Sequence, residues 1–170
     1  LAAAISRVLS ISASVTSSSM SGASSSTSTS TLVGLAASTT GRLGAGGGVY
    51  CVNAGTTNLI VRCRIVDNYA TAGGAGIFCD GASPTVFDCE INGNSATNIY
   101  AVPTGGGGIC AIESSSPHVA NTVISGNRGN YAGGVLCFDG SSPILHNCVV
   151  SGNWADTAGG GIGCALNSDP

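Results

Sequence analysis

Short apolar segments alternate with glycine clusters and polar turns from residue 46 to residue 170. Each copy of this pattern opens with a glycine cluster and passes into a three-residue segment that ends in cysteine: VYC, IFC, GIC, VLC and IGC. A turn follows, and then a second segment in which hydrophobic and polar residues alternate before the copy closes at an asparagine. Period-two alternation broken by Gly and Ser-Pro turns predicts short β-strands rather than helices.

The copies follow one another at a regular interval. The closing asparagines are separated by 26, 33 and 26 residues, and the cysteines of the first segments by 28, 31, 27 and 27 residues. The asparagines are Asn68, Asn94, Asn127 and Asn153, and the cysteines are Cys51, Cys79, Cys110, Cys137 and Cys164. Because a repeat of about 20 to 50 residues is typical of solenoids, the spacing indicates a solenoid.

The repeat predicts a right-handed parallel β-helix, an all-β solenoid of about four to five coils of 26–33 residues. Equivalent residues of successive coils should stack about 4.8 Å apart and form columns of like side chains. We expect one internal column of cysteines and one of asparagines, with the asparagine amides hydrogen-bonded from coil to coil. The second segments should supply further internal columns: Ile60, Cys63 and Ile65; Val86, Cys89 and Ile91; Val119, Thr122 and Ile124; and Leu145, Cys148 and Val150.

The chain divides into two parts. Residues 46–170 carry the repeats, and because Ser168-Asp169-Pro170 matches Ser141-Ser142-Pro143, we interpret them as a fragment of a longer solenoid. Residues 1–45 form a Ser/Thr-rich segment. Within it, residues 15–23 align with residues 86–94, which predicts a degenerate coil followed by an insertion over residues 24–44. A flexible linker is the alternative interpretation.

The cysteine column has two interpretations. Neighbouring Cα atoms at the coil spacing lie within the range that disulfides tolerate, but parallel side chains meet the required torsion poorly. Cysteine is also among the most buried residues as a free thiol. We favour a reduced internal column, with disulfides as the alternative. A linear column does not offer the tetrahedral arrangement that zinc prefers, so no metal site is predicted there.

Composition narrows the class of partner. Charged residues make up 8% of the chain, lysine is absent, and five scattered arginines are offset by eight acids, so no basic surface for nucleic acid is expected. A surface of Ser, Thr, Asn and Gly favours an extracellular or cell-surface location. No apolar run approaches the ~20 residues that cross a bilayer, so we expect no transmembrane segment in this chain.

Three acids are candidates for chemistry. Asp80, Glu113 and Asp139 follow their cysteines by one, three and two residues, which places them near one turn of consecutive coils. Stacked carboxylates could serve as paired acids in glycoside hydrolysis, or as Ca²⁺ ligands beside an arginine base in lyase chemistry. However, Asp80 and Asp139 each precede glycine, which is an ordinary turn signature, and we favour turns over a catalytic or cofactor site. His118 and His146 are out of register and predict no metal pair.

The longest departure from the repeat is the segment from Ala96 to Thr104. Insertions in solenoids form loops that often carry the binding surface. Tyr100 in this segment, with Tyr131 and Trp154 in the corresponding loops of other coils, could form an aromatic surface for glycans. The alternative is that such side chains cover apolar edges of the coils, and we favour that interpretation for Tyr131 and Trp154.

The pattern GGAGI at residues 73–77, together with I/V-x-x-N endings such as Ile91 to Asn94, resembles the polymorphic outer membrane protein repeat, defined by GGA[IVL] and FxxN motifs. It also resembles the wider pectate lyase-like β-helix family. The resemblance covers about residues 46–170, although Ile or Val stands where the membrane-protein repeat has Phe. It implies a β-helix fold that serves adhesins, surface structural proteins and polysaccharide-cleaving enzymes alike.

These observations favour a structural or adhesive protein over an enzyme. We expect an extracellular β-helix that associates with itself or with other subunits, with end-to-end stacking of coils into fibres as one mode of assembly. A polysaccharide lyase, a glycoside hydrolase or a carbohydrate-binding β-helix is the alternative.

Overall fold

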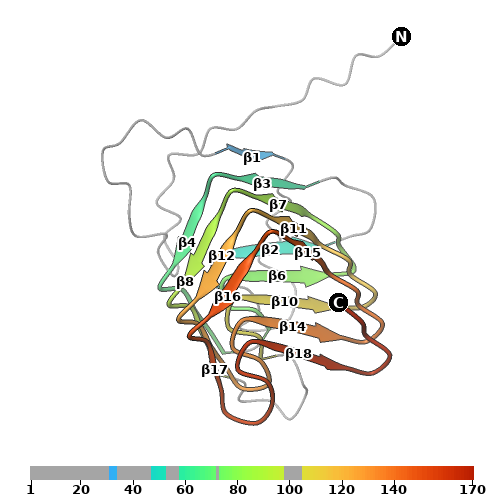
Figure 1. The fold of residues 1–170 in the computed structure, drawn as a ribbon. Coiled ribbons are helices and arrows are strands. Elements are labelled where there is room, and N and C mark those ends of the chain that lie inside the picture. The colour runs from blue at the N-terminus through green and yellow to red at the C-terminus, as the bar shows by residue number, and fades with distance from the viewer. Residues whose placement is uncertain (1–30, 34–46, 53–57, 72, 98–104) are drawn as a thin grey trace.

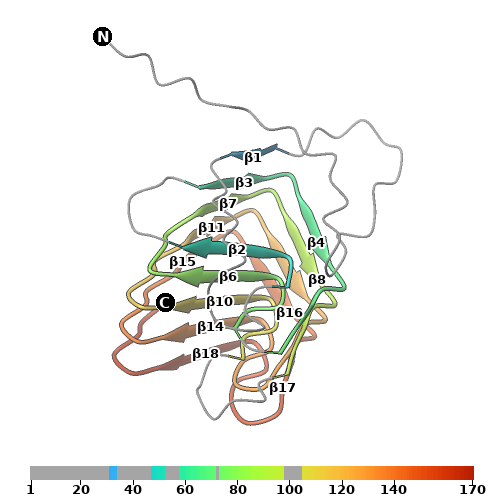
Figure 2. The same cartoon turned by 180° about the vertical axis from the view of Figure 1, so that it is seen from behind.

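The computed structural model describes residues 31–33, 47–52, 58–71, 73–97 and 105–170, with residues 31–33 described by their backbone alone. This part of the chain contains eighteen β-strands and no helix. The strands stack as a parallel β-solenoid of about four turns, in which the chain passes through each sheet once per turn (Figures 1 and 2). The predicted all-β parallel solenoid is therefore confirmed.

The first apolar segment of every copy forms one five-stranded sheet, which we call the cysteine sheet. Its strands are β2 (Val49–Val52), β6 (Ile77–Asp80), β10 (Ile109–Ile112), β14 (Val135–Phe138) and β18 (Ile162–Ala165). All of its neighbours pair in parallel. The glycine that precedes each strand sets the register, so the first residues of the strands stack on one another.

The second segment of each copy folds over a corner into two short strands, and a third, two-residue strand follows. The first set is β3 (Leu59–Val61), β7 (Thr85–Phe87), β11 (His118–Ala120) and β15 (Ile144–His146). The second set is β4 (Arg64–Val66), β8 (Glu90–Asn92), β12 (Val123–Ser125) and β16 (Val149–Ser151). The third set is β5 (Tyr69–Ala70), β9 (Ser95–Ala96), β13 (Arg128–Gly129) and β17 (Trp154–Ala155). We call β2–β5 coil 1, β6–β9 coil 2, β10–β13 coil 3 and β14–β17 coil 4, and β18 begins coil 5.

The central residue of each short strand points into the solenoid. Ile60 pairs with Val86, and Val86 with Val119, while Ile65 pairs with Ile91, and Ile91 with Ile124. These side chains are almost completely buried in one continuous core, as the alternation in the sequence predicts. Full burial of each such side chain stabilises the fold by about 1.5–3 kcal/mol.

The two ends of the solenoid differ. At the N-terminal end, β1 (Thr31–Val33) pairs with β3 in the antiparallel direction, and the side chains of coil 1 in the continuous core are at most 3% exposed. The sequence did not predict β1, which lies inside the proposed insertion; the proposed degenerate coil itself lies outside the described residues. At the C-terminal end, Leu145, Cys148 and Val150 are only half-buried, and Ile162 is 40% exposed although it continues a buried column. Coil 5 is represented by β18 alone in this sequence, and these side chains lie in the last layers of the described residues.

The glycine clusters are required by close packing between coils. A Cβ atom on Gly108 would lie 2.5 Å from the carbonyl oxygen of Gly134 in the next coil and 2.9 Å from Cγ2 of Ile124. Side chains do not fit at such distances, so glycine at this position allows two backbones to meet.

The corner between the two short strands of each coil has a left-handed backbone. Arg62, Asp88, Asn121 and Asn147 have φ between 49° and 54°. Asn and Asp adopt this conformation more readily than other residues that carry a Cβ. The corner therefore explains why polar residues recur at this position.

Candidate functional site

The asparagine column is a continuous hydrogen-bonded ladder inside the solenoid. The side-chain amide of Asn68 donates to Oδ1 of Asn94 at 2.9 Å, Asn94 donates to Asn127 at 2.9 Å, and Asn127 donates to Asn153 at 3.0 Å. Each Oδ1 also accepts the backbone N–H of the preceding asparagine. The second amide hydrogen reaches a backbone carbonyl, such as that of Ile65 from Asn94 at 2.9 Å. The column therefore satisfies buried polar groups and holds the coils together.

The first asparagine ends the ladder with an open acceptor. Oδ1 of Asn68 is buried and has no hydrogen-bond partner among the described residues, and the same is true of Oδ1 of Asn58. In later coils the equivalent oxygen accepts two hydrogen bonds from the coil before it. The oxygen of Asn68 therefore lies where a preceding layer would donate.

A second polar column consists of serines, and it was not predicted from the sequence. Oγ of Ser115 accepts the N–H of Ala82 at 3.0 Å, Oγ of Ser141 accepts the N–H of Ser115, and Oγ of Ser168 accepts the N–H of Ser141. The serines each stand two residues before a proline, at Pro117, Pro143 and Pro170. That spacing is a signal from which the column could have been predicted.

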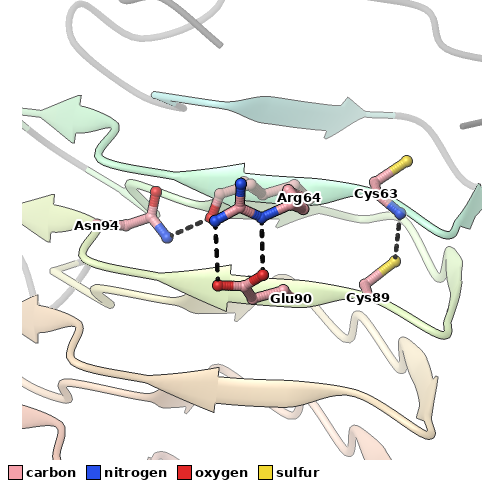
Figure 3. Close-up of polar contacts among 6 residues, drawn as sticks. Cys63, Arg64, Cys89, Glu90 and Asn94 are labelled. Atoms are coloured by element: carbon pink, nitrogen blue, oxygen red, sulfur yellow. Dashed lines mark hydrogen bonds and ion pairs between the residues drawn. The ribbon is translucent and has the colours of Figure 1, made fainter. Parts of the chain in front are cut away.

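A third column lines the corner between the second-segment strands: Cys63, Cys89, Thr122 and Cys148. The thiol of Cys89 donates to the carbonyl of Phe87 at 3.3 Å, and the hydroxyl of Thr122 donates to the carbonyl of Ala120 at 2.9 Å. Figure 3 shows the backbone N–H of Cys63 directed at Sγ of Cys89, at 3.5 Å. Because a hydroxyl takes the same place in coil 3, the role of this column is a local hydrogen bond at the corner.

The five cysteines of the first segments do not form one column. Cys51 pairs with Cys79, and Cys137 pairs with Cys164, but Ala111 occupies this column in coil 3. Cys110 pairs instead with Phe78 and Leu136 and faces the outer side of the sheet, where burial raises the pKa of its thiol to about 12. The reason is the register set by the glycines, since only one residue separates Gly108 from Cys110, whereas two separate Gly76 from Cys79. The predicted five-membered column is thus interrupted in coil 3.

The three candidate acids occupy two different positions. Asp80 lies at the end of β6, where it pairs with Ile112, and accepts a hydrogen bond from the hydroxyl of Tyr50 at 3.0 Å. Glu113 and Asp139 occupy the exposed turn that follows in coils 3 and 4, both with positive φ. The structure therefore does not stack all three carboxylates. Among the described residues, no group of three or more His, Cys, Asp and Glu side chains is arranged to hold a metal ion.

The two histidines are separated by register as expected. His118 pairs with Ile144, and His146 pairs with Ala120. Both side chains are exposed.

The candidate aromatic residues lie on different surfaces. Tyr100 lies outside the described residues. Tyr131 packs against the apolar cluster on the outer side of the cysteine sheet, while Trp154 on β17 is 65% exposed. Tyr69 shares the column of Trp154 but is three coils away, and its hydroxyl is hydrogen-bonded to Thr97 at 2.6 Å. No aromatic surface joins Tyr131 and Trp154.

Trp154 belongs to a small polar cluster instead. It pairs with Arg128, whose Nη2 lies 2.9 Å from Oδ1 of Asp156, and the indole N–H donates to the same oxygen at 3.3 Å. The hydrogen bond from Arg128 lowers the pKa of Asp156. This arrangement holds an exposed indole beside a charged pair.

An apolar hollow of about 320 Å³ opens near the C-terminal end of the cysteine sheet. It is lined by Tyr131, Leu136, Phe138, Ala158 and residues 163–166. Earlier strands fill the corresponding position with Tyr50, Phe78, Cys110 and Leu136, whereas β18 has Gly163. The missing side chain of Gly163 contributes to the hollow.

Comparison with protein-family models, with curated proteins and with solved structures gave no match. No helix in the described part of the chain is long and apolar enough to cross a membrane. The fold and its columns define the chain as a parallel β-solenoid repeat protein.

Proposed function

We propose that this chain is an extracellular or cell-surface structural or adhesive element that associates through the C-terminal end of its solenoid. The observation that carries the proposal is the difference between the ends. Core side chains are buried at the N-terminal end, whereas Ile162, Cys164 and the half-buried Leu145 and Val150 expose the core at the other.

Open β-strand edges favour pairing with another chain. At the C-terminal end, β15, β16, β17 and β18 are the last strands of their sheets in the described chain. Their outer edges are therefore unpaired in the described chain and lie beside the exposed core side chains. Two such ends can meet about a two-fold axis, which gives a closed pair. At the N-terminal end β1 pairs with β3, whereas β2, β4 and β5 are the last strands of their sheets in the described chain. The buried core of coil 1 supports a pair of C-terminal ends over an open fibre, which needs two complementary ends.

Two features support a location outside the cell. The surface is rich in hydroxyl and amide side chains and contains no lysine. The glycine and asparagine motifs resemble the repeats of polymorphic outer membrane proteins and of the wider pectate lyase-like family, in which surface structural proteins and adhesins occur. The resemblance supports the class of function only, because this fold carries several functions.

Substitution at the open end tests the proposal. Ile162→Lys places a charge in the exposed core, whereas Ile144→Lys places the same charge on an outward-facing and more exposed position of β15. Light scattering after gel filtration should give a dimer for the unmodified protein and for Ile144→Lys, and a monomer for Ile162→Lys. A dimer that survives Ile162→Lys would place association elsewhere.

The second candidate function is glycan binding, and the cluster of Arg128, Trp154 and Asp156 is the observation that favours it. Aromatic faces stack on sugar rings, and the fixed charged pair beside Trp154 offers hydrogen bonds to hydroxyls. Calorimetry with neutral and acidic oligosaccharides should show binding that Trp154→Ala removes. Tyr69→Ala, a change at the first position of the same column, should leave that binding intact.

A further inference from the structure

Two thiols of neighbouring coils face each other near the open end. Cys137 on β14 pairs in register with Cys164 on β18, and both lie in the inner column of the cysteine sheet. Neighbouring strands lie about 4.8 Å apart, within the Cα separation of about 4.4–6.8 Å found in disulfides. The two thiols are also close enough to share a hydrogen bond.

The interruption in coil 3 isolates this pair from the other cysteines. The neighbour of Cys137 on its other side is Ala111, and Cys110 faces the outer side of the sheet. Cys148 belongs to the corner column, where its thiol donates to the carbonyls of Val119 and His146, both at 3.4 Å. Within the column, Cys137 therefore has one thiol partner.

Exposure separates this pair from the two other pairs of stacked cysteines. Cys51 with Cys79, and Cys63 with Cys89, are at most 5% exposed. Cys164 is exposed, whereas its partner Cys137 is completely buried. In the single chain, before the proposed pairing of C-terminal ends covers Cys164, an oxidant in solution can thus reach one sulfur of the pair and then be displaced by the other.

We propose that Cys137 and Cys164 form a reversible redox site whose disulfide fastens β18 to coil 4. The thiolate of Cys164 attacks one sulfur of a small disulfide such as oxidised glutathione and releases one glutathione thiol. Cys137 then loses its proton and attacks the sulfur of Cys164, which releases the second glutathione. Two protein thiols are oxidised to one disulfide, and one glutathione disulfide is reduced to two thiols.

The buried position of Cys137 determines how the second step depends on pH. Burial, together with the neighbouring Cys164, raises the pKa of the Cys137 thiol. Because the thiolate is the attacking species, closure of the disulfide becomes faster as the pH increases. The first step, at the exposed sulfur, precedes it.

The test incubates the folded chain, at a concentration at which it is monomeric, with oxidised glutathione, blocks remaining thiols by alkylation and maps the peptides by mass spectrometry. One disulfide between Cys137 and Cys164 is expected, with the other cysteines alkylated after unfolding. Hydrogen exchange at Ile162–Ala165 should slow on oxidation and recover with dithiothreitol, while exchange at Ile77–Asp80 stays unchanged. A wild-type protein that stops at a glutathione adduct on Cys164, or that joins Cys164 to Cys148, would overturn the proposal.

Two variants give the matched controls. Cys137→Ala places the residue of coil 3 in this column, and it should accumulate the glutathione adduct on Cys164 without forming a disulfide. Cys148→Thr copies Thr122 in the corner column and should form the Cys137–Cys164 disulfide at the wild-type rate. Loss of the disulfide in Cys148→Thr would contradict the assignment of the pair.

Discussion

At the scale of single residues, the solenoid depends on positions where the next coil allows only one type of residue. At some of these positions the backbone of the next coil leaves no room for a side chain, and at others an amide of the next coil needs a hydrogen-bond partner. A Cβ atom on Gly108 would overlap the carbonyl of Gly134, whereas a Cβ atom on Gly161, at the same position in coil 5, would lie 3.8 Å from Cγ1 of Val150. The same residue type therefore has different structural importance in the two coils.

Gly108→Ala should destabilise the protein by about 1–3 kcal/mol, because the added methyl group overlaps the next coil. Urea unfolding followed by circular dichroism measures the change. Gly161→Ala is the matched control and should change the free energy of unfolding by less than about 0.5 kcal/mol. Equal losses in the two variants would show that helical or strand propensity, not contact between coils, dominates.

The asparagine ladder makes a second prediction at this scale. Asn94→Ala removes the acceptor of Asn68 and the donor to Ile65 in the dry interior, and should cost about 3 kcal/mol. Asn153→Ala removes an equivalent member that is half-buried, where water can replace the lost partners. The free energy of unfolding should therefore fall less in Asn153→Ala than in Asn94→Ala, and the reverse order would contradict this role.

At the scale of the strand and its corner, local hydrogen bonds set which residues are interchangeable. Cys63, Cys89 and Thr122 each donate to a carbonyl two residues earlier. The alternation in the sequence correctly predicted that Cys63 and Cys89 lie in the core. It did not predict that their thiols donate hydrogen bonds, because these bonds depend on the folded corner.

Cys89→Thr should therefore retain nearly all of the stability, whereas Cys89→Ala should lose about 1 kcal/mol through the missing corner hydrogen bond. Thermal unfolding of the two variants gives the comparison. If Cys89→Ala is the more stable of the two, the thiol serves packing alone.

The ion pair between Arg64 and Glu90 links β4 to β8 on the surface, with Nε of Arg64 2.7 Å from Oε2 of Glu90 (Figure 3). The hydrogen bond from Arg64 lowers the pKa of Glu90, so the folded state binds this proton more weakly than the unfolded state. The stabilisation is then complete above the unfolded pKa of about 4.3 and is lost as the pH falls through the folded value.

Melting temperatures of the wild type and Glu90→Gln should thus differ slightly at neutral pH and converge in acid, since the pair is solvent-exposed. A difference that persists below pH 3 would mean that Glu90 acts through packing rather than charge.

At the scale of the whole molecule, periodicity predicted more than any single motif. The strand order and the internal positions of Ile60, Val86, Val119 and Leu145 followed from alternation and spacing, because a stacked fold converts repeat positions into columns. The position of Cys110 on the outer side of the cysteine sheet was not predicted. The spacing of the cysteines alone does not show which residue after the glycines begins each strand. The antiparallel β1 was equally inaccessible, since its pairing depends on a contact outside the repeat.

The candidate site residues were also predicted only in part. Glu113 and Asp139 share a turn position as the spacing implied, but Asp80 follows its cysteine one residue before that turn and lies in the strand. Trp154 begins β17 and is 65% exposed, whereas Tyr131 packs against the apolar cluster on the outer side of the cysteine sheet. Whether two candidate side chains share a surface depends on the direction in which each one points, and this direction depends on the register of the strands.

If the C-terminal ends of two solenoids join, sedimentation equilibrium of the unmodified protein over a wide concentration range should show this association. The mass should rise from that of one chain, 16.4 kDa, to that of two chains and then remain constant. A mass that stays at one chain at the highest concentration, or that grows without limit, would contradict it.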